Sequence, residues 1–165
     1  TAEVLLDSID MVTASKTDFA DLPAGTRAIS LPDNSYTKAS PFLKVFGRPD
    51  NTSVCECERV SSASLAQSLH LMNASDVKAK LTASGGRAEQ LTKAEMPEPK
   101  RIRELYLAAF SREPTADEVQ IAETHLAKPR IDATGKPLDS QRAKRNGYED
   151  LLWALLNTKE FLFNH

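Results

Sequence analysis

Prolines and glycines set the strongest limit on how this chain folds. Six of them fall between residues 22 and 49: Pro23, Gly25, Pro32, Pro41, Gly47 and Pro49. Proline lacks a backbone N–H and clashes with the preceding turn of a helix, so this density excludes a long helix in that region. We expect extended connections there, with a single helical turn over residues 41–46.

Apolar residues recur at helical spacing in most of the remaining chain. Leu5, Ile9 and Val12 would form one face of a helix near the start, and a stripe of Leu65, Leu69 and Met72 predicts another over residues 64–73. Further helices are expected over residues 75–81, 87–93, 102–110, 115–128 and 141–156. The predicted fold is mainly α, an irregular bundle of about six helices with the extended segment of residues 22–60 wrapped on it.

Capping signals define several helix boundaries. Thr115-Ala-Asp-Glu118 follows Pro114 and has the spacing of a capping box, in which each of two side chains bonds a free backbone N–H. Asn157-Thr-Lys-Glu160 has the same spacing and would open a last turn that carries core residues Phe161, Leu162 and Phe163. The large aromatic residues on apolar stripes are expected to pack in the core: Tyr106, Phe110, Trp153 and Phe161.

Composition restricts the kinds of partner. The densest apolar run, Leu151 to Leu156, is far shorter than the roughly 20 residues of a membrane helix, so no membrane span is expected. A net charge of −2 argues against a surface that neutralises many phosphates. The basic stretch over residues 128–145 lacks the aromatic residues that stack on bases, and is expected to be a solvated loop rather than a nucleic-acid site.

Five segments, in order, resemble a known family. They are Phe42-Leu-Lys-Val-Phe-Gly-Arg-Pro49, Val54-Cys-Glu-Cys-Glu-Arg59, Leu65-Ala-Gln-Ser-Leu-His-Leu-Met-Asn73, Leu105-Tyr-Leu-Ala-Ala-Phe-Ser-Arg-Glu-Pro-Thr115 and Asp150-Leu-Leu-Trp-Ala-Leu-Leu-Asn-Thr-Lys-Glu-Phe-Leu-Phe-Asn-His165. On these segments the chain resembles domain-of-unknown-function family 1553 of planctomycetes.

The resemblance implies a setting rather than an activity. Residues 1–165 would be one domain, the C-terminal part of a large exported protein that lies in the periplasm or outside the cell. Upstream parts of such proteins often carry a related domain and sometimes a c-type cytochrome domain. The present chain has no Cys-x-x-Cys-His motif, so no covalently bound haem is expected in it. The resemblance implies no catalytic residues and no cofactor.

The Cys-x-Cys pair, Cys55 and Cys57, is the most suggestive local feature. In an extended segment both side chains would lie on the same face. A disulfide between them would require a bend, because the Cα separation of about 6.5–7 Å is at the limit of disulfide geometry. A zinc site would need four ligands, with His70 or a carboxylate beside the two thiolates. The third alternative is that both cysteines are small buried side chains.

Charged residues surround this pair. In the third alternative, Glu56, Glu58 and Arg59 would form ion pairs with groups such as Arg48. His70 lies beside the stripe of its predicted helix and is expected to border the core rather than bind a metal. His125 is expected at the surface or at a helix end.

Two functions are compatible with these features. The leading hypothesis is a non-catalytic structural or interaction domain of a multidomain exported bacterial protein. Its partner would be an upstream domain of the same polypeptide or another extracellular component, either a protein or a glycan. The sequence has no Gly-x-Ser-x-Gly, His-Glu-x-x-His or phosphate-loop motif. The alternative is a redox or metal-dependent enzyme module that uses Cys55 and Cys57.

Overall fold

The computed structural model describes residues 1–33, 35–36, 40–48 and 75–163. In this part of the chain the elements are α1 (Ala2–Thr13), a 3-10 turn η1 (Ala28–Ser30), α2 (Pro41–Val45), α4 (Ser75–Leu81), α5 (Arg87–Lys93), α6 (Glu98–Phe110), α7 (Ala116–Leu126), α8 (Ser140–Leu156) and α9 (Lys159–Phe163). The mainly α prediction is confirmed. The described part alone has eight α-helices, more than the six expected, because short segments such as α2 and α9 also form helical turns.

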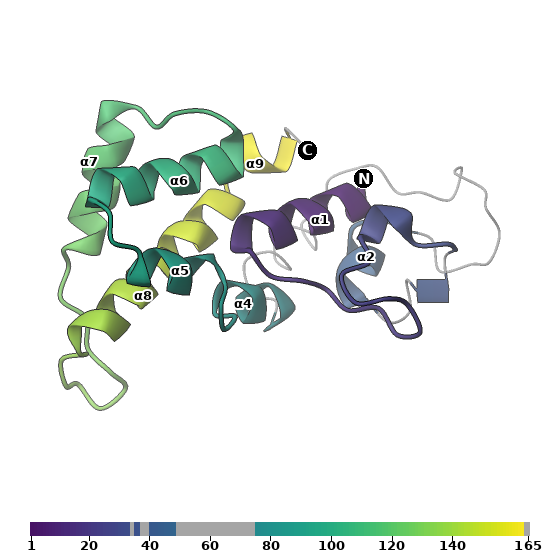
Figure 1. Cartoon of the computed structure of the whole chain (residues 1–165), viewed down its shortest axis with the longest axis horizontal. Coiled ribbons are helices and arrows are strands. Elements are labelled where there is room, and N and C mark those ends of the chain that lie inside the picture. The colour runs from purple at the N-terminus through teal and green to yellow at the C-terminus, as the bar shows by residue number, and fades with distance from the viewer. Residues whose placement is uncertain (34, 37–39, 49–74, 164–165) are drawn as a thin grey trace.

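Helix α1 lies at the centre of the arrangement. It contacts η1 and α2 on one side, and α4, α5, α6 and α8 on the other (Figure 1). The predicted stripe is its buried face, where Ile9 and Val12 are inaccessible to solvent. The helix ends at Ala14, which adopts the left-handed conformation with φ 52° and donates its N–H to carbonyls of the last turn. Most of the other described elements are therefore in contact with this one helix.

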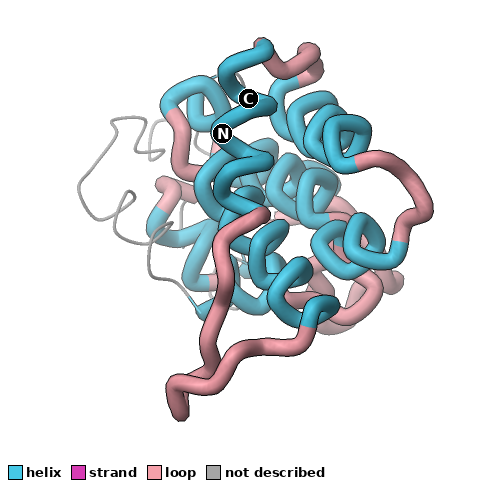
Figure 2. The backbone as a smooth tube through the Cα atoms, turned by 90° about the vertical axis from the view of Figure 1, so that its left-hand side faces the viewer, coloured by secondary structure: helices cyan, strands magenta, loops and turns pink. Residues whose placement is uncertain are grey.

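The C-terminal helices form the larger side of the core. Helix α8 packs on α5, α6 and α7, and buries Tyr148, Leu152 and Leu156 completely. Helices α6 and α7 pack against each other as the expected helix pair. The view in Figure 2 shows the described backbone as helices joined by loops. Thr115 caps α7 through the predicted capping box, with Glu118 N donating to Thr115 Oγ1 at 3.2 Å and Thr115 N donating to Glu118 Oε2 at 2.7 Å.

The segment rich in proline and glycine lies along α1 as far as it is described. Its short helix α2 begins where expected, with Ser40 Oγ accepting from Leu43 N at 3.4 Å and Pro41 in the first turn. Phe42 and Phe46 stack one helical turn apart, with ring centroids separated by 4.4 Å. Phe42 is buried. The predicted turn over residues 41–46 is thus confirmed, and it brings an aromatic pair to the end of the core.

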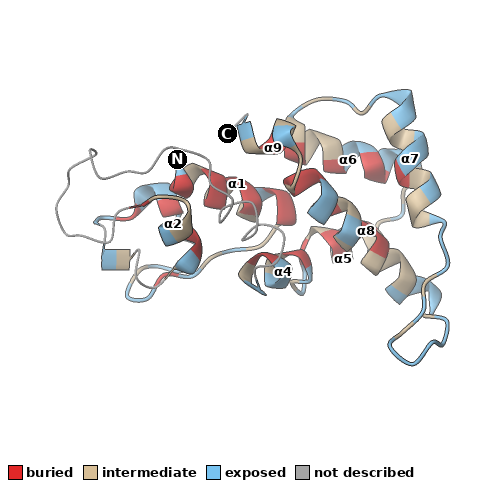
Figure 3. Cartoon of the chain, turned by 180° about the vertical axis from the view of Figure 1, so that it is seen from behind, coloured by how far each residue is buried: buried red, intermediate tan, exposed pale blue. Residues whose placement is uncertain are grey.

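Three predictions about the C-terminal helices are wrong. Trp153 is 38% exposed, because it follows the buried Leu152 by about 100° around α8. Figure 3 shows that α8 has exposed as well as buried residues along its length. In α9 only Phe161 is fully buried, whereas Phe163 is 72% exposed. The last helix is opened by Thr158, whose Oγ1 accepts from Phe161 N at 3.1 Å, and not by Asn157. The capping residue lies one position later than predicted.

None of the described helices is long and apolar enough to cross a membrane.

Candidate functional site

Arg48 is the one candidate site residue within the described part of the chain. Gly47, at φ 86°, ends α2 and turns the chain so that Arg48 N donates to Leu43 O at 2.9 Å. The buried guanidinium lies 3.5 Å from Glu3 Oε1, measured from Nε, and donates from Nη2 to Asp33 O at 2.8 Å. Arg48 therefore joins the end of α2 to α1 and to the connection before α2.

Glu3 is a residue that the sequence analysis missed. Both side chains of the Glu3–Arg48 pair are 5% exposed, so each buried charge is stabilised by the opposite charge of its partner. Glu3 lies one helical turn before Leu6 on the buried side of α1, and a carboxylate at such a position signals a buried cation. The expected partners Glu56 and Glu58 lie outside the described residues, and their pairing with Arg48 stays a prediction.

The other candidate residues are also outside the described part. These are Cys55, Cys57, Arg59 and His70, together with the helix predicted over residues 64–73. The disulfide, the zinc site and the enzyme alternative built on the two cysteines therefore stay predictions. Within the described ranges, no three His, Cys, Asp or Glu side chains are grouped as metal ligands.

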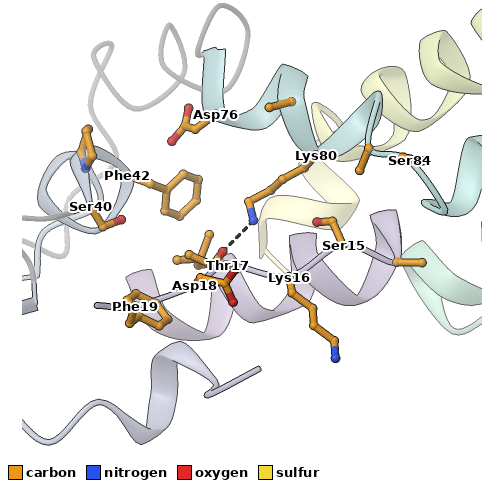
Figure 4. A pocket seen from close by; sticks show the side chains of 15 residues that line it. Ser15, Lys16, Thr17, Asp18, Phe19, Ser40, Phe42, Asp76, Lys80 and Ser84 are labelled. Atoms are coloured by element: carbon orange, nitrogen blue, oxygen red, sulfur yellow. Dashed lines mark hydrogen bonds between the residues drawn. The ribbon is translucent and has the colours of Figure 1, made fainter. Parts of the chain in front are cut away.

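A groove of about 610 Å³ opens between α2, α4 and the residues that follow α1 (Figure 4). Its described lining combines apolar side chains, such as Phe19 and Phe42, with charged ones, such as Lys16 and Asp18. Lys80 extends from α4 toward the residues after α1, as Figure 4 shows. The charges around the groove are of both signs, so the groove has no strong preference for an anion or a cation.

Lys80 is engaged by groups of the protein itself. Its Nζ forms an ion pair with Asp10 and donates to Thr17 Oγ1 at 2.6 Å. Thr17 in turn donates to Asp10 Oδ2 from its backbone N at 2.9 Å and from its hydroxyl at 2.8 Å. Ser15 Oγ adds a donor to Asp10 Oδ1 at 3.3 Å. These hydrogen bonds and the ion pair connect residues 15–17 to α1 and α4.

Arg112 occupies the junction of three helices. Ser111, at φ 56°, ends α6 and turns the chain toward α7. The guanidinium donates to Glu160 of α9 from Nε at 2.6 Å and from Nη2 at 2.8 Å. It also donates to Glu118 of α7 from Nη1 at 2.9 Å and from Nη2 at 2.8 Å. Two carboxylates that are far apart in sequence therefore share one planar cation.

Aromatic rings complete this junction. The guanidinium carbon lies 5.6 Å from the ring centroid of Tyr106 and 5.3 Å from that of Phe110, a cation–π geometry. Hydrogen bonds from Arg112 lower the pKa of Glu118 to about 2 and also lower the pKa of Glu160. Hydrogen bonds to Glu118 and Glu160 raise the pKa of Arg112. All three groups are charged at neutral pH.

Tyr148 lies in a second cluster, between α6 and α8. Its hydroxyl donates to the carboxylate of Glu98, which also faces Arg101 Nη1 at 3.4 Å and Lys144 Nζ at 3.2 Å. Burial, followed by the bond to Glu98, raises the pKa of Tyr148. The hydroxyl therefore stays protonated and serves as a donor to Glu98 at neutral pH.

Arg145 forms a third cluster, where α8 meets α5. Its Nε donates to Glu149 Oε1 at 3.0 Å, its Nη2 donates to Thr82 O at 2.9 Å, and its Nη1 lies 3.4 Å from Glu89 Oε2. Burial raises the pKa of Glu149, while a hydrogen bond from Lys93 lowers that of Glu89. These side chains connect two helices and the turn between α4 and α5.

The fold and these clusters define a class of protein: a mainly α domain whose charged side chains join helices at their junctions. A family model described as "Protein of unknown function (DUF1553)" matches residues 9–126. The chain belongs to this family, as the sequence resemblance indicated. Neither the curated proteins nor the solved structures contain a match to the chain.

Proposed function

We propose that this chain is a non-catalytic structural or interaction domain of a larger exported bacterial protein, and that it docks on a neighbouring domain of the same polypeptide. The observation that carries this proposal is that the ionisable side chains with shifted pKa values form contacts within the fold. Hydrogen bonds between Arg112 and the carboxylates of Glu118 and Glu160 shift the pKa values of Arg112 and Glu118, and burial, followed by the bond to Glu98, raises the pKa of Tyr148.

Active sites usually contain groups whose pKa values are shifted for chemistry, placed in a cleft beside open space. Here the strongly shifted groups are Arg112, Glu118 and Tyr148, and each is bonded to a charged or polar partner within the fold. The groove next to α2 contains charged side chains, but Lys80 is held there by Asp10 and Thr17. This distribution supports a scaffold role.

Exposed apolar side chains support docking. Four of them lie in the C-terminal half: Ile121 on α7, Ile131 on the connection after α7, Trp153 on α8 and Phe163 on α9. Burying such side chains at an interface gains about 25 cal/mol for each Å² removed from water. Helices α7 and α9 both contact α8, and we place the partner on the side of the domain that these three helices form. Export of the parent protein rests on the family resemblance.

Trp153 provides the test, because it is the only tryptophan of the chain. We expect its fluorescence emission to shift to shorter wavelength in the longer natural polypeptide relative to this chain alone, once other tryptophans of the longer protein are replaced by phenylalanine. Amides of α7 and α8 should exchange more slowly in the longer protein. Ile121→Ser should reduce both effects, and Ile29→Ser, at an exposed position on the other side of α1, should not. Identical emission and exchange in the two proteins would refute docking through this side.

A further inference from the structure

The connection between α7 and α8 contains a hairpin that is closed by its own hydrogen bonds. Within it, Ile131 pairs with Pro137, Leu138 N donates to Arg130 O at 2.9 Å, and Asp132 N donates to Lys136 O at 2.8 Å. The turn is closed by Asp132 Oδ1, which accepts from Thr134 N at 2.8 Å and from Lys136 N at 3.0 Å. Residues 130–138 therefore move as one unit if their attachment to the body loosens.

Arg130 provides a side-chain attachment at the base of this hairpin. Its guanidinium lies across α8 at Gly147, where an added Cβ would be 3.7 Å from Nη2. Nη1 donates to Asp150 Oδ2 at 2.6 Å, and Nη2 lies 2.8 Å from His125 Nε2 at the end of α7. His125 Nε2 is also 3.3 Å from Asp150 Oδ2. The three side chains thus connect α7, the hairpin and α8.

The chemistry of this triad depends on the proton of His125. Arginine is only a donor, so the 2.8 Å contact is a hydrogen bond only while Nε2 carries no proton. A protonated imidazole is a donor at both nitrogens, and Nε2 would then turn to Asp150 and lose Arg130. Imidazoles gain this proton in the range of about pH 5 to 8.

We propose that His125 is a pH-dependent clip: when neutral it holds the hairpin of residues 130–138 through Arg130, and when protonated it exchanges that partner for Asp150 and loosens the hairpin. The ion pair between Arg130 Nη1 and Asp150 Oδ2 stays in both states, so protonation removes one of the two side-chain contacts of Arg130 and loosens the hairpin without releasing it. Ile131, exposed on this hairpin, would become mobile with it. The clip goes beyond the proposed function, since it does not depend on docking.

Other ionisable groups lie near His125, and their effects on the pH dependence can be separated from the effect of His125. Asp150 and Arg130 face His125 directly, and Glu149, paired with Arg145, interacts electrostatically with both of them. Burial raises the pKa of Glu149, so its protonation adds a pH dependence of its own on α8. Hydrogen bonds from Thr134 and Lys136 lower the pKa of Asp132, which keeps the turn of the hairpin closed in mild acid. A variant that replaces only His125 keeps Glu149 and Asp132, and so separates the effect of the imidazole from the effects of these two carboxylates.

The test is hydrogen exchange of the Asp132 and Leu138 amides, expressed as protection relative to the intrinsic rate, at pH 8 and pH 5.5. We expect about fivefold lower protection at pH 5.5, the equivalent of one ordinary hydrogen bond. In His125→Gln, whose side chain is neutral at both pH values, protection should stay within twofold. Nitrogen NMR of the imidazole at pH 8 should show Nε2 unprotonated. A protonated Nε2 at pH 8, unchanged protection in the native protein, or an equal loss in His125→Gln would each overturn the proposal.

Discussion

Replacing Arg112 with methionine removes the cation at the junction of α6, α7 and α9 while keeping most of the apolar stem. The variant leaves Glu118 and Glu160 without their shared donor, and the two like charges then face each other across the vacated position. It also removes the cation from the rings of Tyr106 and Phe110. We expect a lower free energy of unfolding and a loosened α9.

The magnitude follows from the partial exposure of the three charged groups. The side chains of Arg112, Glu118 and Glu160 are 35%, 28% and 34% exposed, between a surface pair and a buried one. Exposed ion pairs contribute about 0.2–1 kcal/mol, and hydrogen bonds to buried charged groups about 1.5–3 kcal/mol. An intermediate value of about 1 kcal/mol for each carboxylate, with about 0.5 kcal/mol for the rings, gives a loss of about 2–3 kcal/mol.

Thermal and urea unfolding would measure this loss. For a chain of this size, 2–3 kcal/mol lowers Tm by about 5–10 °C. Arg103→Met is the matched control, because the Arg103–Glu113 pair is bidentate but 48% and 59% exposed, so water screens it and its loss should lower the stability less than the loss of Arg112. A double-mutant cycle between Arg112→Met and Glu160→Gln should give a coupling of about 1 kcal/mol. If Arg112→Met were no more destabilising than Arg103→Met, the reasoning about this junction would be refuted.

Three further predictions concern stability. The pKa of Glu118 is about 2 in the folded protein, below the ordinary glutamate value. The ionised Glu118 therefore stabilises the fold fully above about pH 4.5, and this stabilisation is lost as the pH falls toward 2. Glu118→Gln should flatten the fall of the urea midpoint over this pH range, and an unchanged fall would contradict the prediction. Phe161→Ala should cost about 3–5 kcal/mol in urea unfolding, whereas Phe163→Ala should cost under about 0.5 kcal/mol; equal costs would mean that α9 does not enter the core. Ala14→Gly should raise Tm by a few degrees, because the left-handed conformation at φ 52° costs a non-glycine residue about 1 kcal/mol, and a lower Tm would count against that conformation.

Local signals in the sequence predicted most of the described helices. The Thr115 capping box depends on two residues three positions apart, and both of its hydrogen bonds are present. Helix α4 has the predicted bounds of residues 75–81, and α5 has those of residues 87–93, directly after the break at Gly85-Gly86. The error at Trp153 shows the limit of such signals, since neighbours on one helix differ by about 100° in direction.

The clusters of charged side chains around Arg112 and Arg48 could not be predicted from local sequence signals. Glu160 and Arg112 are 48 positions apart, and Glu3 and Arg48 meet only after the chain has passed through η1 and α2. Periodicity identifies the side of a helix that is buried, but not which charged residue of another helix lies opposite. The sequence predicts Arg48 as an ion-pairing residue of Glu56 and Glu58, whereas its described carboxylate partner, Glu3, belongs to α1.

Glu118 shows how the local and the distant signals are connected. Its carboxylate closes the capping box of α7 through Thr115 N, and the same carboxylate accepts two donors from Arg112. Arg112 also donates from Nε and Nη2 to the carboxylate of Glu160 in α9. Apolar contacts such as those of Phe161 are not directional, so alone they would let α9 slide over the core. A planar guanidinium bonded in two directions fixes the angle, and the start of α7 thereby determines where α9 lies.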